Sequence, residues 1–280
     1  MNWLNETFSH HWMFLLIGPI YIGLEALYPL KRDQKLFRGE LGQDIFWYLL
    51  NNVYIDALLY YVRVYITLNL APHLWAWLIG FFSPLSSEDF LAQFPLKVES
   101  TLLLAFIIFI SRDFLSYWAH YLSHRLKILW SFHILHHSVK ELDWLSGFRS
   151  YWLDGLIFDL IISLPLVFLE VSEEGLTIIA LWETHLQFFI HANYKYSLGP
   201  LGKWLNNNQV HWWHHSTKNH HKYGQNFGSY TLIWDKVFGT YYVESEVPAR
   251  LGLTDPSSYP SNVVKRFFYP FLRLLALFKK

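Results

Sequence analysis

Five stretches of the chain are apolar over the roughly 20 residues that a helix needs to cross a hydrocarbon core. They are residues 12–30, 44–70, 98–118, 153–169 and 175–191. Only 16% of the 280 residues are charged and 53% are hydrophobic, which together with these runs indicates a membrane protein. We therefore predict an all-α membrane protein with four to five transmembrane helices.

Lysine and arginine are distributed unevenly along the chain. Residues 1–30, 64–96 and 150–194 contain none, whereas the short segment KRDQKLFR carries four. Because cytoplasmic loops are enriched in Lys and Arg, five spans with the N-terminus outside would place every basic cluster in the cytoplasm. Four spans would require residues 44–70 to form a bent pair or to lie partly in the interface. The expected location is a bacterial inner membrane or its equivalent.

Composition narrows the remaining possibilities. The formal net charge of zero argues against a nucleic-acid partner, and the absence of cysteine excludes disulfides and thiolate ligands. We expect one integrated domain with N-terminal membrane helices (1–97), a histidine-rich region (98–245) and an amphipathic tail (246–280). The end of the tail, VVKRFFYPFLRLLALFKK, fits either an interfacial anchor or a helix packed on the protein's own core.

The histidines are arranged at helical spacing. Twelve of the 15 lie between positions 120 and 221. The motif HYLSH places two at i and i+4, while HILHH and HWWHH each confine three to an arc of roughly 100° on a helix. One more ends the fifth apolar stretch. These nine, called the box histidines below, are His120, His124, His133, His136, His137, His191, His211, His214 and His215.

Metal binding explains the boxes better than packing does. Clustered imidazoles repel one another when protonated, and each has two ring nitrogens to satisfy. A metal ion resolves both problems, because neutral imidazole is a good ligand. Nine ligands exceed the four of a structural zinc site, so the pattern predicts two metal ions. An all-imidazole set suits iron, copper, nickel or zinc rather than magnesium or calcium.

The predicted topology brings the boxes to one level. The span that begins near residue 98 can continue as helix beyond the membrane, and the hairpin of the last two spans returns His191 to the same face. The boxes would then form a histidine-rich helical cap on the cytoplasmic side that holds a dimetal site. His185 lies six residues before His191, so on a helix it points away by roughly 120° and is expected to lie outside the site. Asp113, two turns before His120, either orients a ligand or pairs with Arg112 or another helix.

The ordered segments RDFLSYWAHYLSHRLKILWSFHILHHS, HAN, HWWHHS and NFGSYTLIWDKVFGTYY resemble the fatty acid hydroxylase superfamily, also called the sterol desaturase family. The run LGPLGKWLNNNQVHWWHH is similar to its alkylglycerol monooxygenase branch. The resemblance covers residues 112–242 and implies a membrane-embedded di-iron oxygenase with the nine box histidines as iron ligands. Relatives often carry an aspartate shortly before the Asn-aromatic-Gly motif, but here His220 and His221 fill that loop. They are expected to surround the ligands, together with Asn226, to replace a ligand, or to lie on the surface.

The resulting hypothesis is a lipid hydroxylase or desaturase that uses molecular oxygen and two iron ions. No G-x-G-x-x-G motif is present, so electrons would come from a separate reductase, ferredoxin or cytochrome. The lipid could be a sterol, a fatty acyl chain, an alkylglycerol or a carotenoid-like molecule. The alternatives are a histidine-rich metal-transport protein and a zinc-dependent lipid hydrolase. The aromatic residues beside the boxes would either wall an acyl tunnel or form an interfacial belt; they are Tyr117, Trp118, Trp130, Trp212 and Trp213.

Overall fold

The computed structural model describes residues 3–55, 101–163, 169, 171 and 173–279, and within these residues the regular structure is helical, as predicted. Extended pairing in this part of the chain is limited to isolated bridges such as Leu205 with Thr231. The longer elements are α1 (Trp3–Leu27), α2 (Leu41–Tyr48), the π-helix η1 (Leu49–Ile55), α6 (Thr101–Arg125), α7 (Lys127–His137), α8 (Trp152–Ile162), α10 (Glu173–His191), α11 (Asn208–His214), α12 (Ile233–Val237) and α13 (Val263–Phe278). Three 3₁₀ turns connect them: η3 (Ser146–Phe148), η4 (Gly199–Lys203) and η5 (Pro256–Ser258).

Helix α6 combines an apolar half with a polar half. It is long and apolar enough to cross a membrane, and no other helix in the described part of the chain meets both criteria. Its first turns expose Leu102, Leu103 and Phe106, whereas Arg112 and His120 further along are buried. The helix therefore leads from an apolar surface into the histidine-rich cap, as predicted for the third apolar stretch.

The other predicted spans are supported to different degrees. Helix α10 has 19 residues and is about 28 Å long at 1.5 Å per residue, whereas α8 has 11 and is only about 16 Å long. A hydrocarbon core is about 30 Å thick, so α8 does not span it alone. In α1 the apolar part is Phe14–Leu27, and most of the second stretch, residues 56–70, lies outside the described residues. The number of spans stays a prediction.

The start of the second apolar stretch lies in a buried ion network instead of facing lipid. Asp44 pairs with the guanidinium groups of both Arg38 and Arg149. Arg38 Nε also donates to Asp143 Oδ2 at 2.5 Å, and Arg149 Nη1 to Glu40 Oε2 at 3.0 Å. Hydropathy alone cannot reveal this network, because Asp143 and Arg149 lie over 100 positions away from Arg38 and Asp44. Paired in this way, the charges tie the α2 region to the loop that follows α7.

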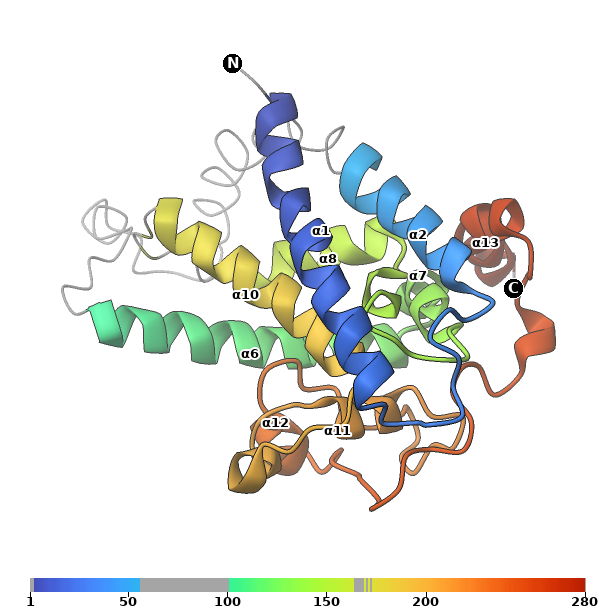
Figure 1. Cartoon of the computed structure of the whole chain (residues 1–280). Helices are drawn as coiled ribbons and strands as arrows, with labels where there is room; N and C mark the ends of the chain where they lie inside the picture. Colours follow the sequence, from blue (N-terminus) through green and yellow to red (C-terminus); the bar gives the residue numbers. More distant parts are fainter. Residues whose placement is uncertain (1–2, 56–100, 164–168, 170, 172, 280) are drawn as a thin grey trace, which may run out of the picture.

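One cluster of the hydrophobic core connects α1 and α10 with the loop that precedes η3. Tyr21, Trp144 and Phe188 pack together from α1, the loop before η3, and α10. Gly18 permits this contact, because a Cβ there would lie 2.7 Å from the Trp144 ring. Figure 1 shows α1, α6 and α10 converging on the region that α11 and α12 occupy.

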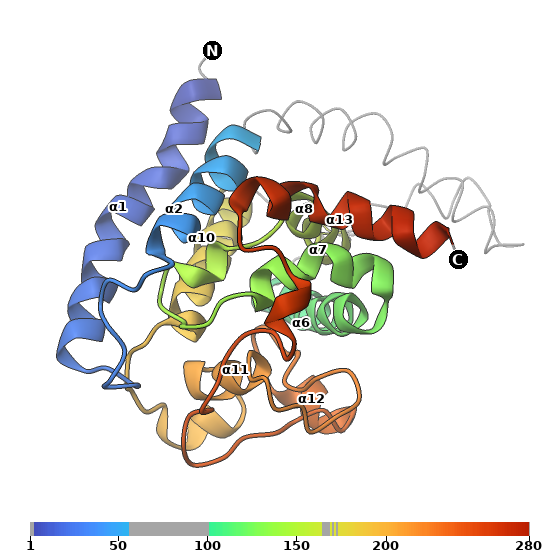
Figure 2. The same cartoon turned by 90° about the vertical axis from the view of Figure 1, so that its right-hand side faces the viewer.

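The C-terminal helix packs on the protein's own core, one of the two predicted roles for the tail, while the role of interfacial anchor stays a prediction. Tyr151 Oη donates to the Phe267 carbonyl at 2.9 Å, and Arg266 is buried, so one face packs on the protein's own core. Figure 2 shows α13 lying along α7, with which it is in contact. The residues that remain exposed on α13 include Val264, Phe268, Leu272, Leu275 and Phe278. The helix is therefore packed on one side and apolar on the other.

Candidate metal centre

The structure brings all nine box histidines together in two groups, each of which could hold a metal ion. Within each group, one ring nitrogen from every member lies within 4.8 Å of the others. Group 1 consists of His120, His124, His133, His137 and His214. Group 2 consists of His136, His191, His211 and His215. The two groups adjoin, since the ring centroids of His137 and His215 are 4.5 Å apart.

Each H-x-x-H-H box contributes to both groups. On α7, His133 and His137 are one turn apart and enter group 1, while His136 enters group 2. On α11 the division is reversed, because His211 and the following His215 enter group 2 and His214 enters group 1. In each box the histidine at i+3 points in a different direction from the pair at i and i+4. Each box therefore contributes imidazoles to both groups.

The ring nitrogens face one another across each group. The Nε2 atoms of His137 and His214 are 3.0 Å apart in group 1. In group 2 the Nε2 atom of His211 lies 2.9 Å from that of His191 and 3.1 Å from that of His215. A neutral imidazole has one N–H and one lone pair, so such clusters direct several lone pairs at a common point.

The residues present fit a pair of transition-metal ions. Burial lowers the pKa of the His136, His137, His211 and His215 imidazoles well below the ordinary value, and that of His214 to about 3, so these rings are neutral, the form in which imidazole can bind a metal. Three buried ring nitrogens of group 1 have no hydrogen-bond partner in the described part of the chain: Nε2 of His120, His124 and His133. Leaving buried polar atoms unsatisfied costs free energy, and metal coordination removes that cost.

Backbone carbonyls hold three of the imidazoles in orientation. The Nδ1–H of His214 donates to the Gln225 carbonyl at 2.7 Å, and that of His120 to the Phe227 carbonyl at 3.0 Å. His191 Nδ1 makes the same contact with Gln187 in the preceding turn of its own helix, at 2.9 Å. Occupying Nδ1 in this way leaves Nε2 to face the group, as in many metal sites.

Asp154 is a supporting residue that the sequence analysis missed. Its Oδ2 lies 2.9 Å from His133 Nδ1, and both side chains are buried. A carboxylate beside a histidine ligand fixes the tautomer and makes the ring a better donor to metal. The sequence does contain a sign of this role, because Asp154 is a charged residue at the start of an apolar stretch. Charged residues in such stretches are seldom without a function.

Replacing Asp154 should weaken metal binding without unfolding the protein. Asp154→Ala is expected to lower metal affinity by about 10–100-fold, the usual effect of losing such a partner. Asp154→Asn keeps an acceptor for His133 and should fall between Ala and wild type. Titrating metal into the apoprotein measures the order, with the exposed Asp33→Asn as a control. Equal affinity in wild type and Asp154→Ala would remove Asp154 from the site.

Asp113 does not have the predicted role of orienting a ligand. Its carboxylate accepts hydrogen bonds from the backbone N–H groups of Tyr230 and Thr231, the Thr231 hydroxyl and the Trp234 indole. Arg112 pairs with Glu183. The polar groups of the 230–234 segment thus occupy both oxygens of Asp113, which braces the loop whose Phe227 carbonyl holds His120.

The other residues expected around the ligands lie outside the two groups. His220 is exposed and stacks on Tyr242 with ring centroids 3.4 Å apart. His221 is partly exposed and belongs to the turn closed by the Gly224 N–H. Asn226 is buried, but its side chain links the carbonyls of Val210 and Tyr242. It therefore supports α11 rather than an imidazole.

A cavity of about 380 Å³, called cavity A, reaches members of both groups. Its histidine wall is formed by His120, His133, His136, His191 and His211. Its apolar wall includes Phe148, Phe158, Ile162, Leu186 and Ile190. None of the five aromatic residues predicted to wall a tunnel lines it. Trp212 and Trp213 instead donate their indole N–H groups to the carbonyls of His191 and Glu246, so they brace the site from behind.

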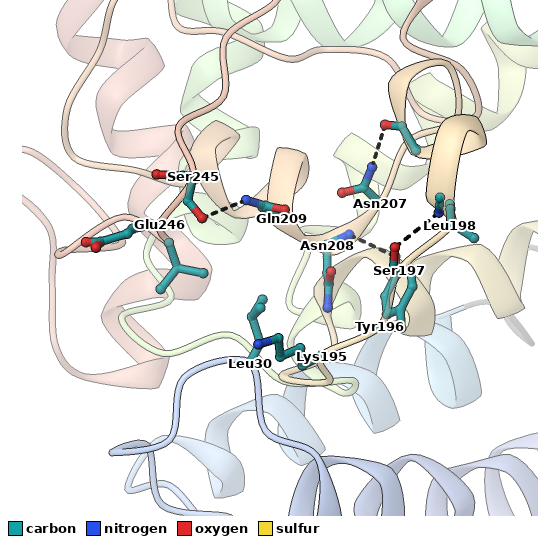
Figure 3. Close-up of a pocket in the computed structure, with 13 residues that line it drawn as sticks. Leu30, Lys195, Tyr196, Ser197, Leu198, Asn207, Asn208, Gln209, Ser245 and Glu246 are labelled. Carbon is teal, nitrogen blue, oxygen red and sulfur yellow. Dashed lines mark hydrogen bonds between the residues drawn. The ribbon is translucent and has the colours of Figure 1, made fainter.

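Two further cavities lie among the described residues, one against group 1 and one apart from both groups. Cavity B, about 210 Å³, is lined by His124, His137 and His214 together with Trp130. Cavity C, about 570 Å³, lies between Leu30, Lys195 and Glu246 (Figure 3). In Figure 3, Gln209 donates to the carbonyl of Ser245 at its edge. No box histidine is among the described residues that line cavity C, so it is separate from the metal centre.

A helical cap that gathers two groups of imidazoles below an apolar helix defines a histidine-rich metal-site protein of the all-α class. Residues 105–240, just under half of the chain, match the family model described as fatty acid hydroxylase, which confirms the predicted resemblance. All nine box histidines lie within the matched residues.

Several proteins of similar sequence have names that state an enzymatic activity. The chain is 30% identical to human alkylglycerol monooxygenase over 169 residues, which is 58% of this chain and 36% of that protein. It is 31% identical to the Danio rerio alkylglycerol monooxygenase over 174 residues, 59% of this chain and 36% of the relative. It is 32% identical to the ornithine lipid hydroxylase OlsE of Rhizobium tropici over 130 residues, 46% and 39% of the two chains. The chain thus spans well under half the length of these relatives, and no solved structure matches it.

Proposed function

We propose that the protein is a membrane-bound di-iron oxygenase that hydroxylates or desaturates a lipid, with molecular oxygen and externally supplied electrons. The observation that carries this proposal is the pair of adjoining imidazole groups along one wall of cavity A, whose other wall is apolar. The printed names of the relatives, a monooxygenase and a hydroxylase of lipids, favour hydroxylation.

The protein's own residues would hold the metals and position the substrate. Group 1 and group 2 would each hold one iron ion, and the ions would supply the activation of oxygen that side chains cannot perform. Cavity A lets an aliphatic segment lie between Phe158 and Leu186 with its C–H bonds beside the imidazoles. Enclosing the reacting carbon in this apolar wall excludes water from it.

Cavity A also has a polar end that suits a lipid headgroup. Glu183 lines the cavity and pairs with Arg112, and Tyr230 Oη donates to the same carboxylate. Ser116 and Ser229 lie beside them with their hydroxyl oxygens 2.5 Å apart. We propose that these groups orient an amphiphilic lipid, since alkylglycerols and ornithine lipids both carry polar heads.

Metal content and oxygen dependence test the proposed function. Protein purified after iron-replete expression should contain two irons per chain and should consume oxygen when it is reduced with lipid present. Lipids of a deletion strain should differ from wild type by one oxygen or two hydrogens. Stable zinc with oxygen-independent lipid hydrolysis would favour a hydrolase, and metal flux into proteoliposomes without lipid oxidation would favour a transporter. Either result would refute the oxygenase.

The proposed orientation places the cap on the cytoplasmic side. Reporters fused after Lys140 and after Lys280 should both report the cytoplasm, because the basic residues concentrate around these positions and are absent from 64–96 and 150–194. Paired reporters, one active only in the cytoplasm and one only outside it, make either answer positive. An external signal at either site would place the histidine groups away from cytoplasmic electron donors.

A further inference from the structure

The histidine groups are approached by two cavities that touch different imidazoles. Cavity A reaches five box histidines through an apolar wall, whereas cavity B reaches His124, His137 and His214. No described residue lines both cavities. If cavity A holds the lipid, as proposed above, cavity B leaves group 1 accessible by a second route.

The wall of cavity B is largely polar. Apart from the imidazoles, its wall includes Ser216, Asn219, Lys222 and Thr254. The turn around Gly224 covers His124 closely: the residue has a φ of +106°, and a Cβ there would lie 3.3 Å from His124 Nδ1. The side chain of Lys222, two residues before Gly224, is exposed.

The rim of cavity B is cationic. Arg125 and Lys222 both lie over the ring of Tyr223, at 5.1 Å and 5.2 Å from its centroid. In the described part of the chain neither cation has a carboxylate within salt-bridge distance, unlike Lys218, which pairs with Glu244. Lys127 is exposed two residues beyond Arg125. Two cations that lack a carboxylate partner among the described residues and flank Tyr223 in the wall of cavity B complement a negatively charged partner.

Trp130 lies beside group 1 in the wall of cavity B. Its ring centroid is 5.0 Å from that of His124 and 5.4 Å from that of His137. A redox group placed at the mouth of cavity B would thus be one aromatic layer from the imidazoles of group 1. Cavity A offers no such approach once lipid fills it.

We infer that the rim of cavity B, formed by Arg125, Lys222 and Tyr223, is the docking surface for an acidic one-electron carrier protein. The inference rests on the proposed function. Hydroxylation converts one oxygen molecule and one C–H bond into an alcohol and water, and consumes two electrons and two protons. Two reduced carriers would supply the electrons, one each, and leave oxidised, while solvent supplies the protons.

Binding of a plant-type 2Fe–2S ferredoxin to the full-length protein in nanodiscs tests this surface. Arg125→Glu with Lys222→Glu should raise the Kd at least about tenfold, because it places like charges together. The matched control, Lys195→Glu with Lys203→Glu near cavity C, makes the same charge change on exposed residues and should stay within about twofold. Raising the salt from low to physiological strength should weaken wild-type binding and the control equally.

The outcomes separate this inference from the proposed function. Iron content and thermal unfolding of the double variants show whether they fold. Ferredoxin binding that is absent in wild type, or equal in the two double variants, would overturn the docking surface even if lipid oxidation is confirmed. Loss of binding to vesicles containing anionic phosphatidylglycerol, with ferredoxin binding intact, would assign the rim to the membrane surface instead. Charge-dependent ferredoxin binding to a protein without iron would refute the oxygenase while leaving the surface in place.

Discussion

His214→Ala should leave the purified protein with about one metal ion per chain instead of two, and with almost no lipid oxidation. His214 contributes to group 1, its Nε2 lies 3.0 Å from that of His137, and the Gln225 carbonyl fixes its ring. Removing it deletes a ligand, so the loss of activity should exceed the roughly 10–100-fold typical of a lost supporting residue. Metal per chain by mass spectrometry and oxygen-dependent product formation measure the two effects.

Group 2 provides the complementary experiment. His136→Ala should remove the other metal ion and spare group 1, although the two residues occupy equivalent places in the two H-x-x-H-H boxes. His220→Ala is the control, because this exposed ring stacks on Tyr242 outside both groups, and it should retain both ions. Full metal and full activity in His214→Ala would exclude the third box from the site.

The spacing of histidines could predict which residues gather, but not how they divide. Helical periodicity assigns members of a box to one face, and all nine box histidines do converge in the structure. Which group each histidine of α7 enters depends on its partners from distant segments, since His136 approaches His191 whereas His137 approaches His214. Such pairings are set by long-range packing, which no local period encodes.

Charged residues were harder to place from the sequence than histidines. Asp113 lies at the helical spacing expected for a residue that supports His120, but its partners lie near Thr231, over 100 positions away. Asp44 opens the second predicted apolar stretch, but in the structure its buried carboxylate pairs with the guanidinium groups of Arg38 and Arg149. A buried carboxylate reveals its role only when its partner is known, and hydropathy ignores partners. Asp154 was missed for the same reason.

The aromatic residues illustrate a second limit. Trp212 and Trp213 lie between histidines of one box, which suggests the wall of the reaction cavity. In a helix, however, neighbouring residues point in directions roughly 100° apart. The imidazoles of the box face the two histidine groups, so the indoles between them face away from these groups. Both indoles are buried, and their N–H groups donate to the carbonyls of His191 and Glu246. Adjacency in sequence thus predicts contact with the site poorly.

His191→Ala should cost the metal of group 2 and nearly all activity, whereas His185→Ala, six residues earlier on α10, should keep both metals. His191 is buried, its Nε2 lies 2.9 Å from that of His211, and its Nδ1–H donates to Gln187. Gly147 packs so closely against this ring that a Cβ there would lie 2.7 Å from Nδ1. The close approach of Gly147 and the contacts at both ring nitrogens therefore fix the orientation of this imidazole.

His185 differs in every respect that matters for a ligand. Its side chain is exposed, it lies outside both groups, and its ring approaches Tyr21 of α1 with centroids 5.9 Å apart. Its replacement by alanine should change the free energy of unfolding by no more than about 0.5 kcal/mol, as for other surface substitutions. The pair is matched in residue type, helix and substitution, so a difference in metal content reports geometry alone. Metal loss in His185→Ala with retention in His191→Ala would reverse the face of α10 that meets the metal centre, and with it the assignment of group 2.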